Sequence, residues 1–329
     1  MKRTEDGRQL HTMIEDDADG MKLEQYLRQR MHFTKTQISR MKFRENGMMV
    51  DGERVRISHV LRAGECLQLM VEEQNNGSGH LEQDDGQLEI LYEDEDLIAV
   101  WKEAGLVVHP SHGHYRDTLS NRVHTYFLRK GSPVTVRSIG RLDRDTCGIV
   151  VFAKNRIAAA RLWEQKENGI FWKEYLAVCR GRMDGEPDRR EKEFENETER
   201  APEDGWRTIS APIGKLPGDL MRMCVSESGK AAVTHYRILR RTQKETLVQV
   251  RIETGRTHQI RVHMKFIGHP LPGDFLYHPD YTYIGRQALH SAYLRFSHPT
   301  TGKLLEFEAP LPDDMKRLFP DQGRLKPFG

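Results

Sequence analysis

Opposed charges stand directly before an apolar segment in the stretch GRLDRDTCGIVVFAKN, residues 140–155. Four of the five residues from Arg141 to Asp145 are charged, and the run from Ile149 to Ala153 is apolar throughout. An apolar run of this length predicts a buried strand. A carboxylate at its entrance, held by an arginine that favours the charged form, can act as a base or a nucleophile. The residues alone do not choose between Asp143 and Asp145, and a surface loop without chemistry is the alternative.

A second group of polar side chains lies in ETGRTHQIRVHMKFIGHPLPGDFLY, residues 253–277. It comes directly after VQVRI, residues 248–252, which alternates as a strand does. Its members are Arg256, His258, Gln259, Arg261, His263 and Lys265. A helix that begins near Thr257 would carry them at its start, where backbone N–H groups and arginines favour an anion such as phosphate. The two histidines are five residues apart, off the i, i+4 spacing of a helical zinc pair, and no glutamate lies between them. We therefore predict no metal site here.

Two further residues have both a structural and a chemical interpretation. The segment KEYLAV, residues 173–178, alternates as a strand does, and its Tyr175 fits a core tyrosine with a bonded hydroxyl as well as a tyrosine in a site. Cys147 leads directly into the apolar run, so we interpret it as a buried thiol that packs like a small hydrophobe rather than as a nucleophile. The sequence contains no phosphate-loop, dinucleotide-binding or nucleophile-elbow motif.

The composition narrows the class of protein. A chain of 329 residues that is 37% hydrophobic is long enough for two domains with packed cores. The formal net charge is only +2, but acidic residues gather at 72–96 and 184–204 and basic ones at 28–44 and 251–265. Such segregation predicts a basic face for a polyanion. Four separated cysteines favour free thiols in a reducing cytoplasm, and neither a signal peptide nor a membrane-spanning run is expected.

Changes in composition divide the chain into segments. We expect a flexible arm over residues 1–19, a compact module over 20–73, a polar linker over 74–87, a main domain over 88–312 with a charged insertion at 183–207, and a C-terminal tail over 313–329. In the main domain strands outnumber helices without regular βαβ alternation. This predicts an α+β protein whose catalytic domain is built on a large mixed, mainly antiparallel sheet.

The compact module combines helices with strands and carries a basic helix. Leu23, Tyr26 and Leu27 share one helical face, and Asp51-Gly52 after an apolar run is a hairpin signal. The second helix, TKTQISRMKFR, presents basic side chains at Lys35, Arg40, Lys42 and Arg44. These residues could form a solvated face or bind phosphates of a nucleic acid, since clustered cations displace its counterions.

Three motifs of the main domain resemble those of the RluA-type pseudouridine synthases. IGRLDRDTCGIVVFAKN resembles the signature H-R-L-D-x-x-T-S-G, WKEYLAVCRG is similar to the K-x-Y-x-A motif, and ETGRTHQIRVHMKFIGHPLPGD is similar to the third motif. The resemblance covers roughly residues 88–312. Residues 20–73 also resemble the S-four RNA-binding module. The family isomerises uridine in RNA to its carbon-linked form, so the resemblance implies the pseudouridine synthase fold, an RNA partner and no cofactor.

Residue by residue, the resemblance implies Asp143 as the catalytic aspartate and Tyr175 against the target base. It implies an ion pair between Arg261 and Asp143, and it assigns Arg141 to displacing or holding the nucleotide. A base stacked in RNA must be flipped into a pocket to be reached. An ionised carboxylate can then stabilise or trap positive character at the sugar. Attack on the sugar, attack on the base and proton abstraction all stay open for Asp143.

Other side chains are expected to contact the substrate: Arg256, His258, Gln259 and Lys173. Two positions depart from the family pattern, with Gly140 in place of histidine and Cys147 in place of serine or threonine. We expect a cytoplasmic monomer that modifies structured RNA, with large-subunit ribosomal RNA favoured over transfer RNA. The alternatives are a non-catalytic RNA-binding or ribosome-assembly protein on the same fold and, more remotely, a hydrolase that uses Cys147.

Overall fold

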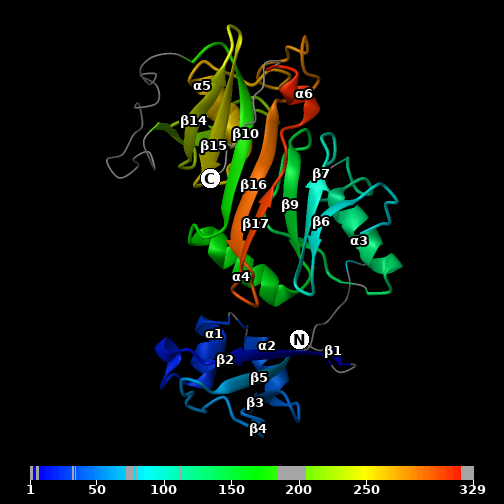
Figure 1. Cartoon of the computed structure of the whole chain (residues 1–329), viewed down its shortest axis with the longest axis vertical. Coiled ribbons are helices and arrows are strands. Elements are labelled where there is room, and N and C mark those ends of the chain that lie inside the picture. The colour runs from blue at the N-terminus through cyan, green and yellow to red at the C-terminus, as the bar shows by residue number, and fades with distance from the viewer. Residues whose placement is uncertain are drawn as a thin grey trace.

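The computed structural model describes residues 3–4, 7–31, 33, 35–71, 78, 81–111, 113–132, 134–183 and 205–319. It forms an N-terminal module and a larger catalytic domain (Figure 1). No helix in these ranges is long and apolar enough to cross a membrane. The predicted insertion at 183–207 lies mostly outside the described residues, but Met183 is buried and Trp206 begins a strand.

The N-terminal module is a five-stranded sheet covered by two short helices. Its elements are β1 (Arg3–Thr4), β2 (Gly7–Met13), α1 (Leu23–Gln29), α2 (Lys35–Lys42), β3 (Met48–Val50), β4 (Glu53–Arg54) and β5 (Cys66–Val71). The strand order is β1-β2-β5-β3-β4. The hairpin expected at Asp51-Gly52 is confirmed, since β3 pairs antiparallel with β4 around it.

The expectation of a flexible arm over residues 1–19 was wrong for the described part of that segment. Strand β2 pairs antiparallel with β5 from Arg8 to Met13, and Leu10 and Ile14 are buried in the module core. GRQLHTM contains few apolar residues, so its sequence does not predict a strand. It becomes one because an edge of β5 offers unpaired backbone groups.

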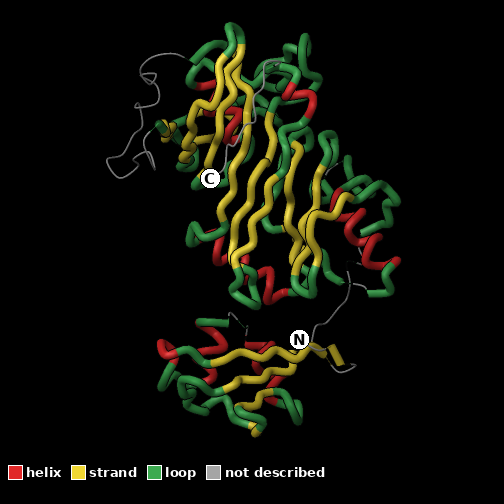
Figure 2. Tube along the Cα trace, viewed as in Figure 1, coloured by secondary structure: helices red, strands yellow, loops and turns green. Residues whose placement is uncertain are grey.

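The catalytic domain is built on a ten-stranded sheet (Figure 2). Its strands are β6 (Glu89–Glu93), β7 (Leu97–Lys102), β8 (Arg137–Ser138), β9 (Cys147–Ala153), β10 (Trp172–Arg180), β11 (Trp206–Ser210), β14 (Val233–Arg241), β15 (Glu245–Ile252), β16 (Leu289–Ser297) and β17 (Leu304–Glu308). A separate hairpin joins β12 (Ile213–Lys215) to β13 (Met223–Val225). The main order is β11-β14-β15-β10-β16-β9-β7-β6, and among the described strands only β9 and β16 pair in parallel. The predicted α+β class with a mixed, mainly antiparallel sheet is confirmed.

Four helices accompany this sheet: α3 (Leu119–Arg129), α4 (Arg156–Glu167), α5 (Gln259–Phe266) and α6 (Asp313–Lys316). Strand β9 shows why both faces of the sheet are covered. Its alternate residues Val150 and Phe152 belong to the core cluster shared with α3 and α5, whereas Ile149 and Val151 pack with α4 on the opposite face. A strand with apolar side chains on both faces is stable only between two layers.

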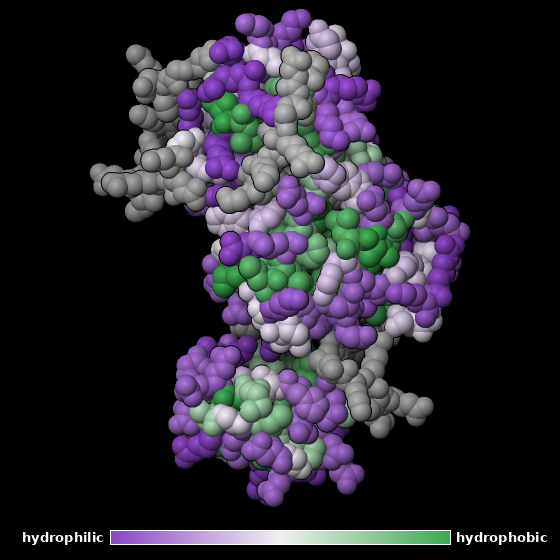
Figure 3. Space-filling model, viewed as in Figure 1, coloured by the Kyte–Doolittle hydropathy of each residue, from purple (hydrophilic) through white to green (hydrophobic). Residues whose placement is uncertain are grey.

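The predicted boundaries of the catalytic domain need two corrections. Residues 313–319 are not a tail, because Met315 and Phe319 are buried against Leu176 and Val178 of β10. The described part of the predicted linker also docks on the domain, since the Asn121 amide donates to the Glu82 carbonyl at 2.7 Å. The face in view is largely hydrophilic, with apolar patches over the middle of the domain (Figure 3).

Gly148 tests the parallel contact between β9 and β16. It has a φ of 119°, and a Cβ there would lie 2.2 Å from the carbonyl oxygen of Ser291. Gly148→Ala should therefore lower the free energy of unfolding by about 2–4 kcal/mol, through backbone strain and overlap. Urea titration measures this. Gly285→Ala is the control, since nothing lies within 4 Å of its added Cβ; equal losses in both variants would contradict the prediction.

Candidate active site

The charged stretch before β9 forms a loop between β8 and β9. The Thr146 N–H donates to the carbonyl oxygen of Asp143 at 3.1 Å, which closes a tight turn. Gly140 enters the loop with a φ of 89°, a conformation that favours glycine. Leu142 is buried in the core cluster shared with α5, so the loop is fixed on that face of the sheet and Asp143 faces the same side.

Asp143 and Arg261 form an ion pair across 118 residues of sequence. The Arg261 Nη1 donates to Asp143 Oδ2 at 2.9 Å. Arg261 lies on α5 and is 2% exposed, whereas the side chain of Asp143 is 21% exposed. The carboxylate is therefore held from the interior and open to a molecule that enters from solvent. Asp145, the alternative carboxylate, instead pairs with its neighbour Arg144.

Asp274 is the second partner of Arg261, and sequence reasoning missed it. Its two oxygens accept hydrogen bonds from Arg261 Nε at 2.7 Å and Nη2 at 2.8 Å, and it is fully buried. Its Oδ1 also accepts the backbone N–H groups of Leu276 and Tyr277. Asp274 lies at the end of the third motif and is the first carboxylate after Arg261 in the sequence. This closeness in sequence is the signal by which it could have been found.

The charges around Arg261 determine its state. Burial disfavours its charged form, but the hydrogen bonds and charge of Asp274, together with the charge of Asp143, outweigh burial and raise the pKa of Arg261. Arg261 is thus a permanent cation. With two carboxylates around one guanidinium, the group carries one net negative charge.

Tyr175 lies on β10 and is buried in the same core cluster as Leu142. Burial and then the charge of Asp143 raise the pKa of Tyr175, so the phenol is neutral at physiological pH. Its ring is a flat apolar wall near the carboxylate, and a neutral hydroxyl can both donate and accept a hydrogen bond.

Tyr277 contacts the other side of Arg261, with its ring centroid 5.0 Å from the guanidinium carbon. Its hydroxyl accepts the Met223 N–H at 2.8 Å and lies 3.0 Å from His258 Nδ1. Burial raises the pKa of Tyr277 to about 12 and lowers that of His258. His258 and the Tyr277 hydroxyl thus share a hydrogen bond between two neutral groups.

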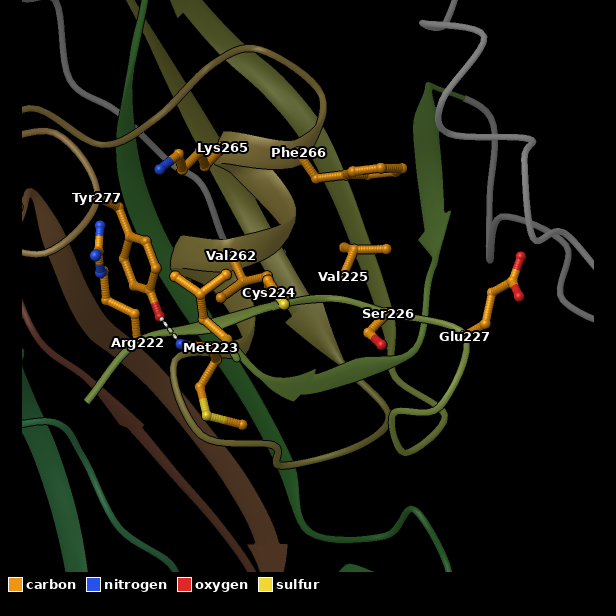
Figure 4. A pocket seen from close by; sticks show the side chains of 11 residues that line it. Arg222, Met223, Cys224, Val225, Ser226, Glu227, Val262, Lys265, Phe266 and Tyr277 are labelled. Atoms are coloured by element: carbon orange, nitrogen blue, oxygen red, sulfur yellow. Dashed lines mark hydrogen bonds between the residues drawn. The ribbon is translucent and has the colours of Figure 1, made fainter. Parts of the chain in front are cut away.

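A cavity of about 500 Å³ adjoins Tyr277 (Figure 4). Its walls come from the β12–β13 hairpin and from α5: Leu216, Arg222, Met223, Cys224, Val225, Ser226, Glu227, Val262, Lys265 and Phe266. Tyr277 therefore separates this cavity from the Arg261 ion pair.

The remaining predicted substrate residues have different positions. Arg141 is exposed on the loop, and Lys173 is half-buried with its Nζ 5.1 Å from the Tyr175 ring centroid. Arg256 is exposed and donates to the carbonyl oxygen of Ala231. Gln259 was expected to bind substrate, but it is buried and its amide bonds only to protein. This side chain joins α5 to β14, which is a structural task.

Lys102 supports the loop that carries Asp143 from inside the domain. Its fully buried Nζ donates to the carbonyl oxygens of Glu103 at 2.8 Å, Leu106 at 2.6 Å and Arg144 at 2.7 Å. Three acceptors satisfy all three ammonium protons. The Gly105 N–H also donates to the Arg144 carbonyl. The residue after Asp143 is thus anchored to the end of β7, an arrangement that no sequence signal indicated.

On the N-terminal module, Lys35, Arg40 and Lys42 lie on the exposed face of α2, while Ile38 and Met41 are buried. Arg44 follows the helix and is half-buried. Cys147 is a buried thiol as predicted, 3.5 Å from His290 Nδ1, and burial raises its pKa. Within the described ranges no cluster of histidine, cysteine or carboxylate side chains could hold a metal ion.

Known proteins share this arrangement of motifs. A family model for RNA pseudouridylate synthase matches residues 96–266, which include the first two motifs and the third as far as Phe266. The chain belongs to the RNA pseudouridylate synthase family. It is 37% identical to the uncharacterized RNA pseudouridine synthase YjbO of Bacillus subtilis, covering 87% of this chain and 94% of that protein. It is 34% identical to ribosomal large subunit pseudouridine synthase D of Nitrosomonas europaea, covering 93% and 85% respectively.

Structural similarity agrees with this assignment. Human RNA pseudouridylate synthase domain containing 1 superposes with a TM-score of 0.52 at 25% identity, covering 69% of this chain and 86% of that one. This pseudouridine synthase is therefore an isomerase whose substrate is RNA, on the fold that its sequence motifs predicted. The catalytic domain accounts for the match with the family model, and the basic module precedes it.

Asp274→Asn should destabilise this pseudouridine synthase. The amide presents one acceptor oxygen where two carboxylate oxygens held Arg261, and removing the partner of a buried charge costs about 3–5 kcal/mol. Chemical denaturation measures the loss. The exposed Asp313→Asn, which removes only a surface pair with Lys316, is expected to unfold at the wild-type midpoint; an unchanged midpoint for Asp274→Asn would contradict the prediction.

Acid should destabilise the domain through His263. This buried imidazole donates to the Ala211 carbonyl and accepts from the Thr234 hydroxyl, and burial lowers its pKa to about 4. The unfolded chain takes up the proton near pH 6.5, so stability is lost as the pH falls below that value, by about 2 kcal/mol at pH 5. His263→Gln should reduce the fall in unfolding free energy between pH 6.5 and 5. The exposed His11→Gln is the control, and identical pH profiles for all three proteins would contradict the prediction.

Proposed function

We propose that this enzyme isomerises specific uridines in structured RNA by means of Asp143. The ion pair between Arg261 and Asp143 is the observation that carries this proposal. It holds a carboxylate at the entrance of the domain, beside a buried aromatic wall. Breaking a glycosidic bond generates positive character at the sugar, which such a carboxylate stabilises or traps.

In this proposal each neighbouring side chain has a separate task. Arg261 orients the carboxylate, with Asp274 fixing the plane of the guanidinium. Tyr175 stacks against the flipped uracil, and its hydroxyl takes part in proton transfer. Arg141, exposed on the same loop, displaces the target nucleotide from its stack. Arg256 and Lys173 supply further cations for the RNA backbone, and His258 steadies Tyr277.

Large-subunit ribosomal RNA is the substrate that we favour. Relatives from Nitrosomonas europaea and Pseudomonas aeruginosa, both 34% identical, bear the name ribosomal large subunit pseudouridine synthase D. The basic side chains on the exposed face of α2 would add phosphate contacts from the N-terminal module, which we propose as an RNA-binding module. A cytoplasmic location, with four free thiols in a reducing compartment, is part of the same proposal.

Asp143→Asn is the direct test. The amide keeps the shape but not the charge, so pseudouridine formation in transcribed large-subunit ribosomal RNA should fall on the order of 10³-fold or more. Chemical labelling of pseudouridine measures the product. Folding should persist, because Arg261 retains Asp274.

Asp145→Asn is the matched control, two residues along the same loop and paired only with Arg144 in the described structure. It should keep nearly full activity. Full activity in Asp143→Asn would contradict the mechanism. No labelling by the wild type, with RNA binding intact, would favour a non-catalytic RNA-binding protein on this fold.

A further inference from the structure

Two lysines converge on the wall of the active site beside Gly140 and Tyr175. Lys166 is the second-last residue of α4, and Lys173 is the second residue of β10. Among the described residues no carboxylate oxygen lies within ion-pair distance of either one. Lys130 and Lys154, by contrast, both pair with Glu93. Two cations left unneutralised at one place are an anion-binding arrangement.

The side chain of Lys166 lies between Trp163 and the loop that carries Asp143. Its Nζ lies 4.5 Å from the ring centroid of Trp163, a cation–π contact that fixes the side chain. A Cβ added to Gly140 would lie 3.2 Å from this same Nζ. The ammonium group therefore lies beside the loop, in space that a side chain at position 140 would otherwise fill.

Lys173 lies next to the residue proposed to stack on the target base. Its Nζ is 5.1 Å from the Tyr175 ring centroid. Burial and then the charge of Lys166 lower the pKa of Lys173 to about 7. Near neutral pH the free enzyme therefore holds Lys173 only partly protonated, and an anion bound beside the two lysines would favour the protonated form.

The negative charge around Arg261 is unfavourable for a nearby phosphate unless cations lie beside it. Asp143, Asp274 and Arg261 together carry one net negative charge, which repels the phosphates on either side of a flipped nucleotide. Cations beside this group offset the repulsion at short range, where solvent and salt screen least.

We propose that Lys166 and Lys173 together bind one of the two phosphates that flank the target nucleotide. This inference rests on the proposed function and deepens it, because it assigns a place to the RNA backbone. Helix α4 also connects this phosphate site to the N-terminal module, since Ile157 near its start is buried in the core cluster of that module. Nine residues separate Ile157 from Lys166, or about 14 Å along a helix, so RNA held by the module could reach the phosphate site within a few nucleotides.

The salt dependence of binding tests this site. The probe is a single-stranded dodecamer of uridylate, and the dissociation constant is measured from 0.05 to 1 M salt for the full chain. Lys166→Gln and Lys173→Gln should each lower the magnitude of the log–log slope by about 0.7, the contribution of one phosphate on a single strand. When the salt concentration falls from 1 M to 0.1 M, each variant should therefore gain about fivefold less affinity than the wild type. Lys166→Arg, which keeps the charge, should restore the wild-type slope.

Lys130→Gln is the matched control, because it removes a surface lysine that Glu93 already neutralises. Each variant should unfold at the wild-type midpoint. Unchanged slopes for both site variants, or an equal decrease for Lys130→Gln, would overturn the proposal. In the double variant the loss should be smaller than the product of the single losses, since both lysines hold one phosphate; a full product would mean two separate contacts and would also overturn it.

The same proteins are assayed for pseudouridine formation in transcribed large-subunit ribosomal RNA. The expected result is an increase in KM for Lys166→Gln and Lys173→Gln with kcat reduced less than threefold. Wild-type activity in this assay reports on the proposed function separately. A wild type without activity whose salt slope still depends on both lysines would reject the proposed function and keep the phosphate site.

Discussion

Arg261 is a buried cation, and the need to neutralise it determines the structure around Asp143. A buried guanidinium is tolerated only when its donors meet charged acceptors with good geometry. Asp274 takes Nε and Nη2 in a bidentate pair, which leaves Nη1 to point at Asp143. Because the guanidinium is planar, the pair with Asp274 also sets the direction from which the loop carboxylate is held.

The sheet brings the three motifs to this point. The loop before β9 supplies Asp143, β10 supplies Tyr175, and α5 packs on the same face of the sheet through Ile260 and Met264. Lys102 donates to the Arg144 carbonyl of the loop, and Arg286 Nη1 donates to the Asp145 carbonyl at 3.5 Å. Because these hydrogen bonds already hold the loop, its carboxylate would lose little entropy when a substrate binds. Such preorganisation lowers the entropic cost of a reaction.

Charge is distributed to suit an anionic substrate. The interior group around Arg261 contains two carboxylates, whereas Arg141, Lys166 and Lys173 near the loop are basic side chains. In the proposed mechanism, these side chains attract the backbone of the RNA while its target sugar meets the carboxylate of Asp143. The exposed basic side chains of α2 extend this pattern to the N-terminal module.

Local patterns in the sequence predicted much of this protein. The apolar run at 149–153 and the alternation at 173–178 became strands, and the three motifs identified the family. Residues whose structure depends on distant partners were missed. GRQLHTM became a strand by pairing with β5, and Phe319 is buried because it docks on β10.

The candidate site divides in the same way. From its residues alone, the loop GRLDRD offered two carboxylates of equal merit, and the motif selected Asp143. The resemblance also implied the pair of Arg261 with that carboxylate, which the structure contains. Only the tertiary structure enclosed Asp274 beside it and turned Gln259 inward to join α5 to β14. Periodicity and charge are local properties that a sequence states directly. The partners of a buried charge are decided by packing, because only a folded chain excludes the water that would otherwise solvate it.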